Sequence, residues 1–77
     1  MIRTDQRDEW WNKGKLHRAD GPALITYRDG KVNEARWIYN GKFLGVHDDG
    51  FWALWDLLSP RQQDDPKLLD WLPGVRQ

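Results

Sequence analysis

The residues best suited to chemistry are the two histidines, His17 and His47, because imidazole binds metals and exchanges protons near neutral pH. The chain has no cysteine, and neither histidine has a glutamate at a ligand spacing beside it, so the pattern does not predict a metal site. We expect His17 to be structural instead and to lie against Trp10. Arg18 and Asp20 are expected to contact each other and to fix the turn that follows.

The carboxylates also have a structural interpretation. Four aspartates stand where helices are expected to begin: Asp48, Asp49, Asp64 and Asp65. Side-chain oxygens at such positions accept hydrogen bonds from the first free N–H groups of a helix. The single serine, Ser59, precedes Pro60 and suits the same role. With no nucleophile–base pair, glycine-rich phosphate loop or zinc spacing, the sequence predicts no catalytic residue, no cofactor, no metal and no enzyme.

Length and composition indicate one small domain. Seventy-seven residues bury only about 60% of the unfolded surface, and without cysteine no disulfide adds stability. No apolar run approaches the ~20 residues of a membrane span, and no signal-peptide pattern is present, so we expect no membrane partner and a cytoplasmic location. Six tryptophans must supply much of the core. Six are more than so small a core hides easily. We expect most of them in the core, and the alternative is that one or two are binding anchors.

Charge is unevenly distributed along the chain. Residues 1–46 contain nine Lys or Arg against six Asp or Glu, a balance of +3, and residues 47–72 contain two against six, a balance of −4. Neither part is extreme enough to indicate nucleic acid as a partner.

Turn residues divide the first part of the chain into short strands. Lys13-Gly14, Asp20-Gly21, Asp29-Gly30 and Asn40-Gly41 are turn signals, and Asn40-Gly41 is the strongest, typical of a type I′ hairpin. The strands are expected at residues 10–12, 15–17, 22–28, 34–39 and 42–46. The last hairpin pairs Ile38 with Phe43 and Trp37 with Leu44. Before it, we expect a five-residue loop at 29–33, or an equivalent bulge, because this pairs Ile25 with Trp37 on an apolar face.

Residues 10–16 and 37–43 repeat the pattern Trp-x-x-x-Gly-Lys followed by Leu or Phe, with a period of 27. The two copies then diverge, which indicates that the repeats stop here and that a segment of different structure covers the end of the last one. Residues 51, 54, 55 and 58 form an apolar helical stripe, and Asp48 or Asp49 is the expected N-cap. Asp65-Pro66 marks the start of a second short helix.

The longer pattern Trp-x-x-x-Gly-Lys-Leu-His-Arg-x-Asp-Gly-Pro-Ala at residues 10–23 resembles a short repeat of small bacteriophage and prophage proteins. Those repeats are related to the MORN-like hairpin repeats that are also seen in bacterial antitoxin-type proteins. The resemblance extends over about residues 10–46. It implies a β-meander without cofactor or known catalytic residue. It also suggests a phage protein in the bacterial host cytoplasm that occupies a host protein, such as a defence (CRISPR-type) complex or a polymerase.

The predicted fold class is therefore α+β, an antiparallel β-meander of four to five short strands with one or two short C-terminal helices packed on one face. We expect a single domain, residues 1–77, with a mobile arm or late-starting strand at 1–9, hairpin repeats at 10–46 and a helical cap at 47–74.

Short helices can cover only one face of such a sheet, although both faces carry apolar residues. We therefore expect a protein-binding module. The candidate partner-binding residues are Trp10, Trp11, Leu16, Arg18, Ile38, Phe43 and Trp52. One alternative is a structural homo-oligomer, for example a homodimer, formed through the uncovered face. Another is a single-stranded nucleic-acid binder that stacks bases on Trp10 and Trp11, which the zero net charge disfavours.

Overall fold

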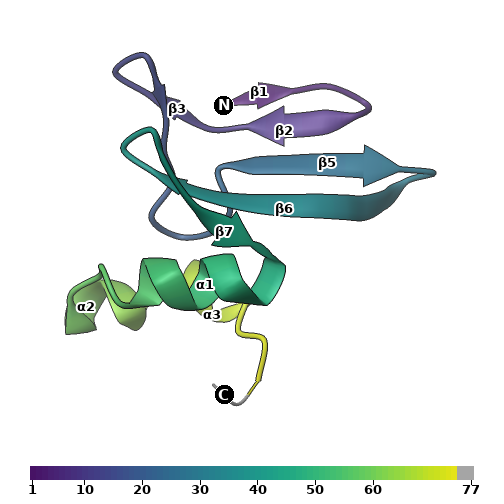
Figure 1. Ribbon diagram of the computed structural model, residues 1–77. Helices are drawn as coiled ribbons and strands as arrows, with labels where there is room; N and C mark the ends of the chain where they lie inside the picture. The colour runs from purple at the N-terminus through teal and green to yellow at the C-terminus, as the bar shows by residue number, and fades with distance from the viewer. Residues whose placement is uncertain (75–77) are drawn as a thin grey trace.

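The computed structural model describes residues 1–74, and within them the chain forms two antiparallel sheets and three short helices (Figure 1). The larger sheet has the strand order β1 (Ile2–Arg3), β2 (Arg7–Glu9), β5 (Leu24–Arg28), β6 (Lys31–Tyr39), β7 (Lys42–Val46). The smaller one pairs β3 (Trp11–Asn12) with β4 (Lys15–Leu16). The helices are α1 (His47–Trp55), α2 (Pro60–Gln63) and α3 (Pro66–Leu69). The predicted α+β class is confirmed.

For the first nine residues the structure shows strands, the second of the two expectations, and not a mobile arm. They form the β1–β2 hairpin, which places Ile2 opposite Glu9. β2 then pairs with β5, with Asp8 facing Ile25. The hairpin itself was not predicted because Arg7-Asp8-Glu9 has no apolar alternation. Its pairing rests on backbone hydrogen bonds and on charged side chains that find partners in the fold.

The β3–β4 hairpin continues the larger sheet beyond the end of β5. Its turn, Lys13-Gly14, has φ angles of 52° and 77°, the left-handed values of a type I′ turn. The Leu16 carbonyl accepts a hydrogen bond of 2.8 Å from the Gly41 N–H, and the Ile38 carbonyl accepts one of 3.3 Å from the Arg18 N–H. The repeated hairpins at residues 10–16 and 37–43 therefore lie side by side.

A bulge sets the register between β5 and β6. The observed pairs are Arg28 with Lys31, Tyr27 with Val32, Thr26 with Glu34 and Ile25 with Ala35. The turn is the two-residue Asp29-Gly30, and Asn33 is the extra residue. The expected bulge is thus present, but the preferred pairing of Ile25 with Trp37 is wrong. One inserted residue is enough to place Ile25 opposite an apolar partner, so a longer loop is not needed.

The β6–β7 hairpin has the predicted type I′ turn at Asn40-Gly41, and Ile38 faces Phe43 as expected. A second bulge then shifts the register, so that Trp37 faces Gly45 and not Leu44. Leu44 is displaced from the ladder and packs against the core beneath the sheet. That apolar contact explains the departure from simple pairing.

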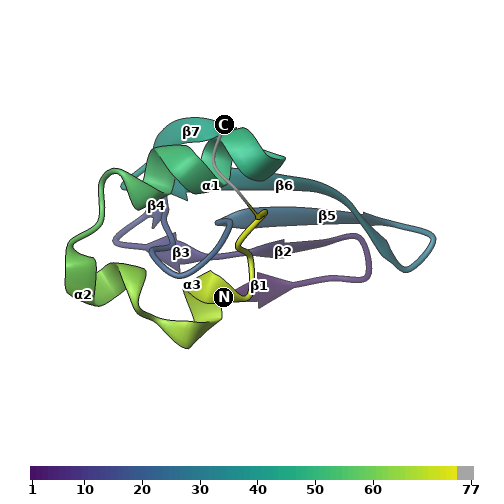
Figure 2. The same ribbon diagram turned by 90° about the horizontal axis from the view of Figure 1, so that it is seen from below.

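The helices lie on one side of the sheet (Figures 1 and 2). They bury a core made of Trp37, Phe51, Leu54, Leu58 and Leu68. At its closest approach, α1 presents Gly50 to the indole of Trp37, where an added Cβ would lie 2.2 Å from Cδ1. Strand and helix therefore meet at van der Waals distance only because this residue has no side chain.

The helix starts differ in how they are capped. α1 follows β7 without a loop, its N-cap is Val46, and no side chain caps it. The predicted capping by Asp48 or Asp49 is wrong, since both lie inside the first turn. The Ser59 hydroxyl accepts a hydrogen bond from the Gln62 N–H at the start of α2. Asp65 caps α3 as predicted, through a 2.9 Å bond from the Lys67 N–H.

Candidate protein-interaction surface

Four apolar side chains gather on the sheet face that the helices leave uncovered, here called the open face. Trp11 faces Leu16 across the β3–β4 hairpin, and Ile38 faces Phe43 across the β6–β7 hairpin. Side chains alternate between the two sides of a strand. Together with the strand pairing, this alternation places five residues on one side of the sheet: Glu9, Trp11, Leu24, Arg36 and Ile38. These four apolar residues, Trp11, Leu16, Ile38 and Phe43, are called the open-face patch below.

The outer members of the open-face patch are exposed. Trp11 has 47% and Phe43 54% of its surface accessible, whereas Ile38 lies beneath them at 9%. The Trp11 Nε1–H donates a 2.8 Å hydrogen bond to the Glu9 carboxylate, which holds the indole in one orientation. A fixed, exposed aromatic ring loses little conformational freedom on binding, so it suits a binding anchor.

Two charged pairs also lie on the open face. Arg7 pairs with Glu9 at 2.7 Å, and Arg36 pairs with Glu34. The two pairs together carry no net charge and lie beyond one end of the open-face patch. Sequence reasoning did not name these residues as part of the surface. The alternation along β6, in which residues 34, 36 and 38 share a face, is the signal that indicates two of them.

Trp10 and Arg18 do not belong to the open face. Trp10 lies between Glu9 and Trp11 and therefore points to the opposite side, where the Arg18 guanidinium covers its ring. Arg18 also pairs with Asp20 at 2.8 Å, so the expected contact between these two residues is present. These two candidate partner-binding residues therefore contact each other within the chain.

His17 makes structural contacts on two sides. Its backbone N–H donates a 2.9 Å hydrogen bond to the carbonyl of Trp10, the expected neighbour, and its ring lies 4.6 Å from that of Tyr39. Its Nδ1 accepts a 2.9 Å hydrogen bond from the Asn40 N–H at the next hairpin turn. This side chain therefore ties the first hairpin to the second.

Trp52, the remaining candidate, is on α1 and is half-buried. It packs edge-on against Phe51 at 4.8 Å and against Trp55 at 5.9 Å between ring centres. The structure thus places it within the helical layer, on the other side of the sheet from the open-face patch.

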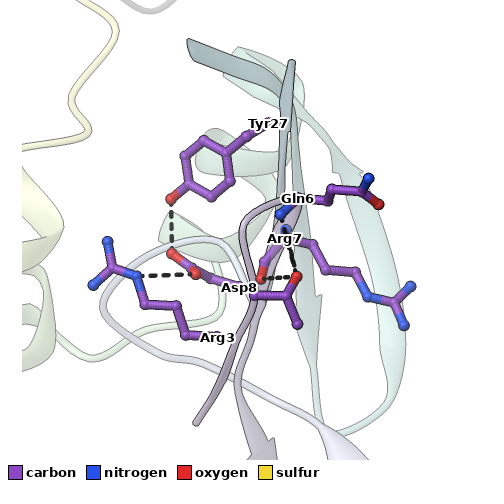
Figure 3. Close-up of polar contacts among 6 residues, drawn as sticks. Arg3, Gln6, Arg7, Asp8 and Tyr27 are labelled. Carbon is purple, nitrogen blue, oxygen red and sulfur yellow. Dashed lines mark hydrogen bonds and ion pairs between the residues drawn. The ribbon is translucent and has the colours of Figure 1, made fainter. Parts of the chain in front are cut away.

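A buried polar cluster in the N-terminal hairpin was not predicted (Figure 3). The Asp8 carboxylate is 4% exposed, accepts a 2.7 Å hydrogen bond from the Tyr27 hydroxyl and pairs with Arg3 at 3.5 Å. The hydrogen bond to Asp8, helped by burial and by the negative charge of that carboxylate, raises the pKa of Tyr27 above its usual 10.0. The cluster fastens β1 and β2 to β5.

Among residues 1–74, no group of three or more His, Cys, Asp or Glu side chains is placed to hold a metal ion. None of the helices in that part of the chain has the length and apolar character that crossing a membrane requires. Comparison of the chain with protein-family models, with curated proteins and with solved structures gives no match.

Proposed function

We propose that this chain is a non-enzymatic protein-binding module that docks through the open-face patch. The observation that supports this function is the alignment of two like cross-strand pairs, Trp11 with Leu16 and Ile38 with Phe43, on the side of the sheet without helices. Their exposed aromatic rings resemble the anchors that dominate binding energy at protein interfaces. A soluble protein rarely leaves such rings together on its surface without a use.

The charges around the open-face patch favour a protein over a nucleic acid as partner. Arg7 and Arg36 on this face are each paired with a glutamate, and Arg18 is paired with Asp20 on the other side. A phosphate backbone would have to compete with those carboxylates. A partner that presents an apolar side chain, with uncharged or mixed-charge surroundings, meets no such cost.

The proposal extends to a phage-type protein that occupies a host protein in the bacterial cytoplasm, such as a defence complex or a polymerase. Its support is the resemblance of residues 10–23 to the phage repeat. Those residues build the β3–β4 hairpin, which supplies Trp11 and Leu16 to the open-face patch. Half of the open-face patch, including one of its two exposed aromatic rings, thus comes from this motif.

Affinity capture from a bacterial lysate tests the function. The double variant Trp11→Ser with Phe43→Ser removes both exposed rings. The matched control, Leu57→Ser with Leu69→Ser, removes two exposed leucines of the helical layer. If two anchors contribute about 2 kcal/mol or more together, the first variant loses roughly thirtyfold in affinity and the control retains it.

The supporting result is one protein, identified by mass spectrometry, that the wild type and the control recover equally and the open-face variant does not. Equal recovery by all three chains, or no partner for the wild type, contradicts the proposal. Sedimentation at several concentrations separates it from self-association through the same face. A homodimer that the Trp11→Ser, Phe43→Ser variant abolishes would assign the open-face patch to a second copy instead.

A further inference from the structure

The two repeated hairpins contact each other in a way that shows what a repeat hairpin can bind. Residues 16–18, which follow the first turn, lie antiparallel to residues 38–41 of the second hairpin. Two N–H groups of the second turn and one strand carbonyl take part in this contact, which is called the repeat contact below. Its hydrogen bonds run from Gly41 N–H to the Leu16 carbonyl (2.8 Å), from Asn40 N–H to His17 Nδ1 (2.9 Å) and from Arg18 N–H to the Ile38 carbonyl (3.3 Å).

The first hairpin carries the same three groups on its own outer side. With the repeat period of 27, residues 11–14 correspond to residues 38–41. The turns have nearly the same backbone, with φ angles of 52° and 77° in the first and 50° and 80° in the second. Both hairpins also have the same cross-strand register next to the turn. Residues 11–14 therefore direct one carbonyl and two N–H groups outward, as the second hairpin does.

The two outer sides differ in what lies against them. An added Cβ at Gly41 would lie 3.4 Å from Cδ of Lys15, whereas one at Gly14 would have nothing within 4 Å. Residues 11–15 are all exposed. In the described part of the chain, the N–H groups of the first turn and the Trp11 carbonyl have no hydrogen-bond partner beyond their own hairpin. An unpaired strand side of this kind accepts a strand from another chain.

The chain has no segment of its own that repeats the contact on this side. Residues 16–18 are already engaged with the second hairpin. Their counterparts in the repeat, residues 43–45, have Leu44 in place of His17 and form a bulge. Leucine offers no acceptor to a turn N–H, so a second copy of the chain lacks the side chain that the contact uses. The occupant is therefore a different protein.

The repeat contact also specifies the sequence of the occupant. Leu16 contributes its side chain to the open-face patch, the next residue supplies the acceptor, and the third donates its N–H. We infer that residues 11–14 dock an extended segment of a partner protein in which an apolar residue, a residue with a side-chain acceptor such as histidine, and a residue other than proline follow one another. The apolar residue lies beside Trp11 and extends the open-face patch. This inference rests on the proposed function, because it names the kind of segment that the partner presents.

Nuclear magnetic resonance of the isotope-labelled full chain tests the docking. The probe is the peptide acetyl-Gly-Lys-Leu-His-Arg-Ala-amide, which has the sequence of residues 14–19. At millimolar concentration we expect it to shift the amide signals of Lys13 and Gly14 severalfold more than those of Asn40 and Gly41, whose N–H groups are already bonded. A peptide with alanine in place of histidine, and one with proline in place of arginine, should each shift the first two signals severalfold less.

Two variants of the chain check where the peptide lies. Trp11→Ser removes the ring beside the apolar residue and is expected to reduce the shifts severalfold. Phe43→Ser changes the member of the open-face patch on β7, the strand farthest from β3, and should leave them unchanged. No shift of the Lys13 and Gly14 signals, equal shifts with the alanine peptide, or equal effects of the two variants overturns the inference. Shifts of these signals with protein concentration alone would assign the site to a second copy and overturn it too.

A final comparison separates this inference from the proposed function. A lysate partner that the Trp11→Ser, Phe43→Ser variant loses, but whose binding leaves the Lys13 and Gly14 amides unshifted, supports the function and overturns the strand docking. Peptide docking at these two amides without any lysate partner supports the docking and contradicts the function.

Discussion

The guanidinium carbon of Arg18 lies 4.0 Å from the centre of the Trp10 ring, in a cation–π arrangement. Gly21 is also close to this group, because an added Cβ there would be only 2.6 Å from that carbon. Arg18 also donates a 3.2 Å hydrogen bond to the Pro22 carbonyl. The motif at residues 10–23 therefore forms a structural lock, in which the Arg18 cation contacts an indole and lies close to a glycine.

Removing the cation should loosen this lock. We expect Arg18→Ala to lower the free energy of unfolding by about 2 kcal/mol, because a cation–π contact and two hydrogen bonds are lost. Urea denaturation measures the change. Arg28→Ala, at an exposed position beside a turn, is the control and should cost about 0.5 kcal/mol or less. Equal effects of the two variants would contradict the role of the lock.

The contact between Gly50 and Trp37 should tolerate no side chain. In Gly50→Ala the new methyl group would lie 2.2 Å from Trp37 Cδ1 and 2.5 Å from the Gly45 carbonyl oxygen. We expect a loss of about 3 kcal/mol or more, seen as a strongly lowered urea midpoint. The comparison is Gly30→Ala, which has a φ of 77° but open space around it and should cost about 1 kcal/mol. A smaller loss at residue 50 than at residue 30 would show that α1 can move away from β6.

Tyr27 should make stability depend on alkaline pH. Because its pKa is raised in the folded state, the stabilisation it gives is complete below pH 10.0 and is lost as the pH rises through the folded-state value. Tyr27→Phe should lower the free energy of unfolding by about 1–2 kcal/mol at neutral pH, since Asp8 loses a hydrogen bond. The decline in stability at alkaline pH should then be shallower than in the wild type. Parallel curves for the two proteins would rule out this linkage.

The α3 cap offers a matched pair of neighbouring aspartates. Asp65→Ala removes the side chain that accepts the Lys67 N–H and should cost about 1 kcal/mol. Asp64→Ala changes an exposed aspartate one position earlier, at the C-cap of α2, and should cost clearly less. Thermal unfolding of both variants measures the difference. If Asp64→Ala were the more damaging, the capping assignment would be wrong.

The hairpins were predictable because turn chemistry is local. Asn40-Gly41 and Lys13-Gly14 require left-handed backbone angles, which Gly14, Gly41 and Asn40 adopt at low cost, so these residues indicate the turns. A bulge or longer loop was expected at residues 29–33, but its register was not, and the bulge at Leu44 was not expected, since both registers depend on which apolar residue fills the core beneath the sheet. That information lies in α1 and not in the strands themselves.

The candidate surface was predictable in part for a related reason. Alternation along the hairpins indicated that Trp11, Leu16, Ile38 and Phe43 share a face. It did not reveal that Arg18 covers Trp10, because that contact depends on how the chain turns after His17. The burial of Asp8 was also beyond sequence patterning, since its partners Arg3 and Tyr27 belong to two other strands.

The direct passage from β7 into α1 makes chain length at this point a strict constraint. A helix turns by about 100° with each residue, so one inserted residue between Val46 and His47 would rotate Phe51 and Leu54 away from Trp37. A loop would absorb such an insertion, but here strand and helix adjoin. At the junction of β7 and α1, substitutions are therefore tolerated far better than insertions or deletions of a residue.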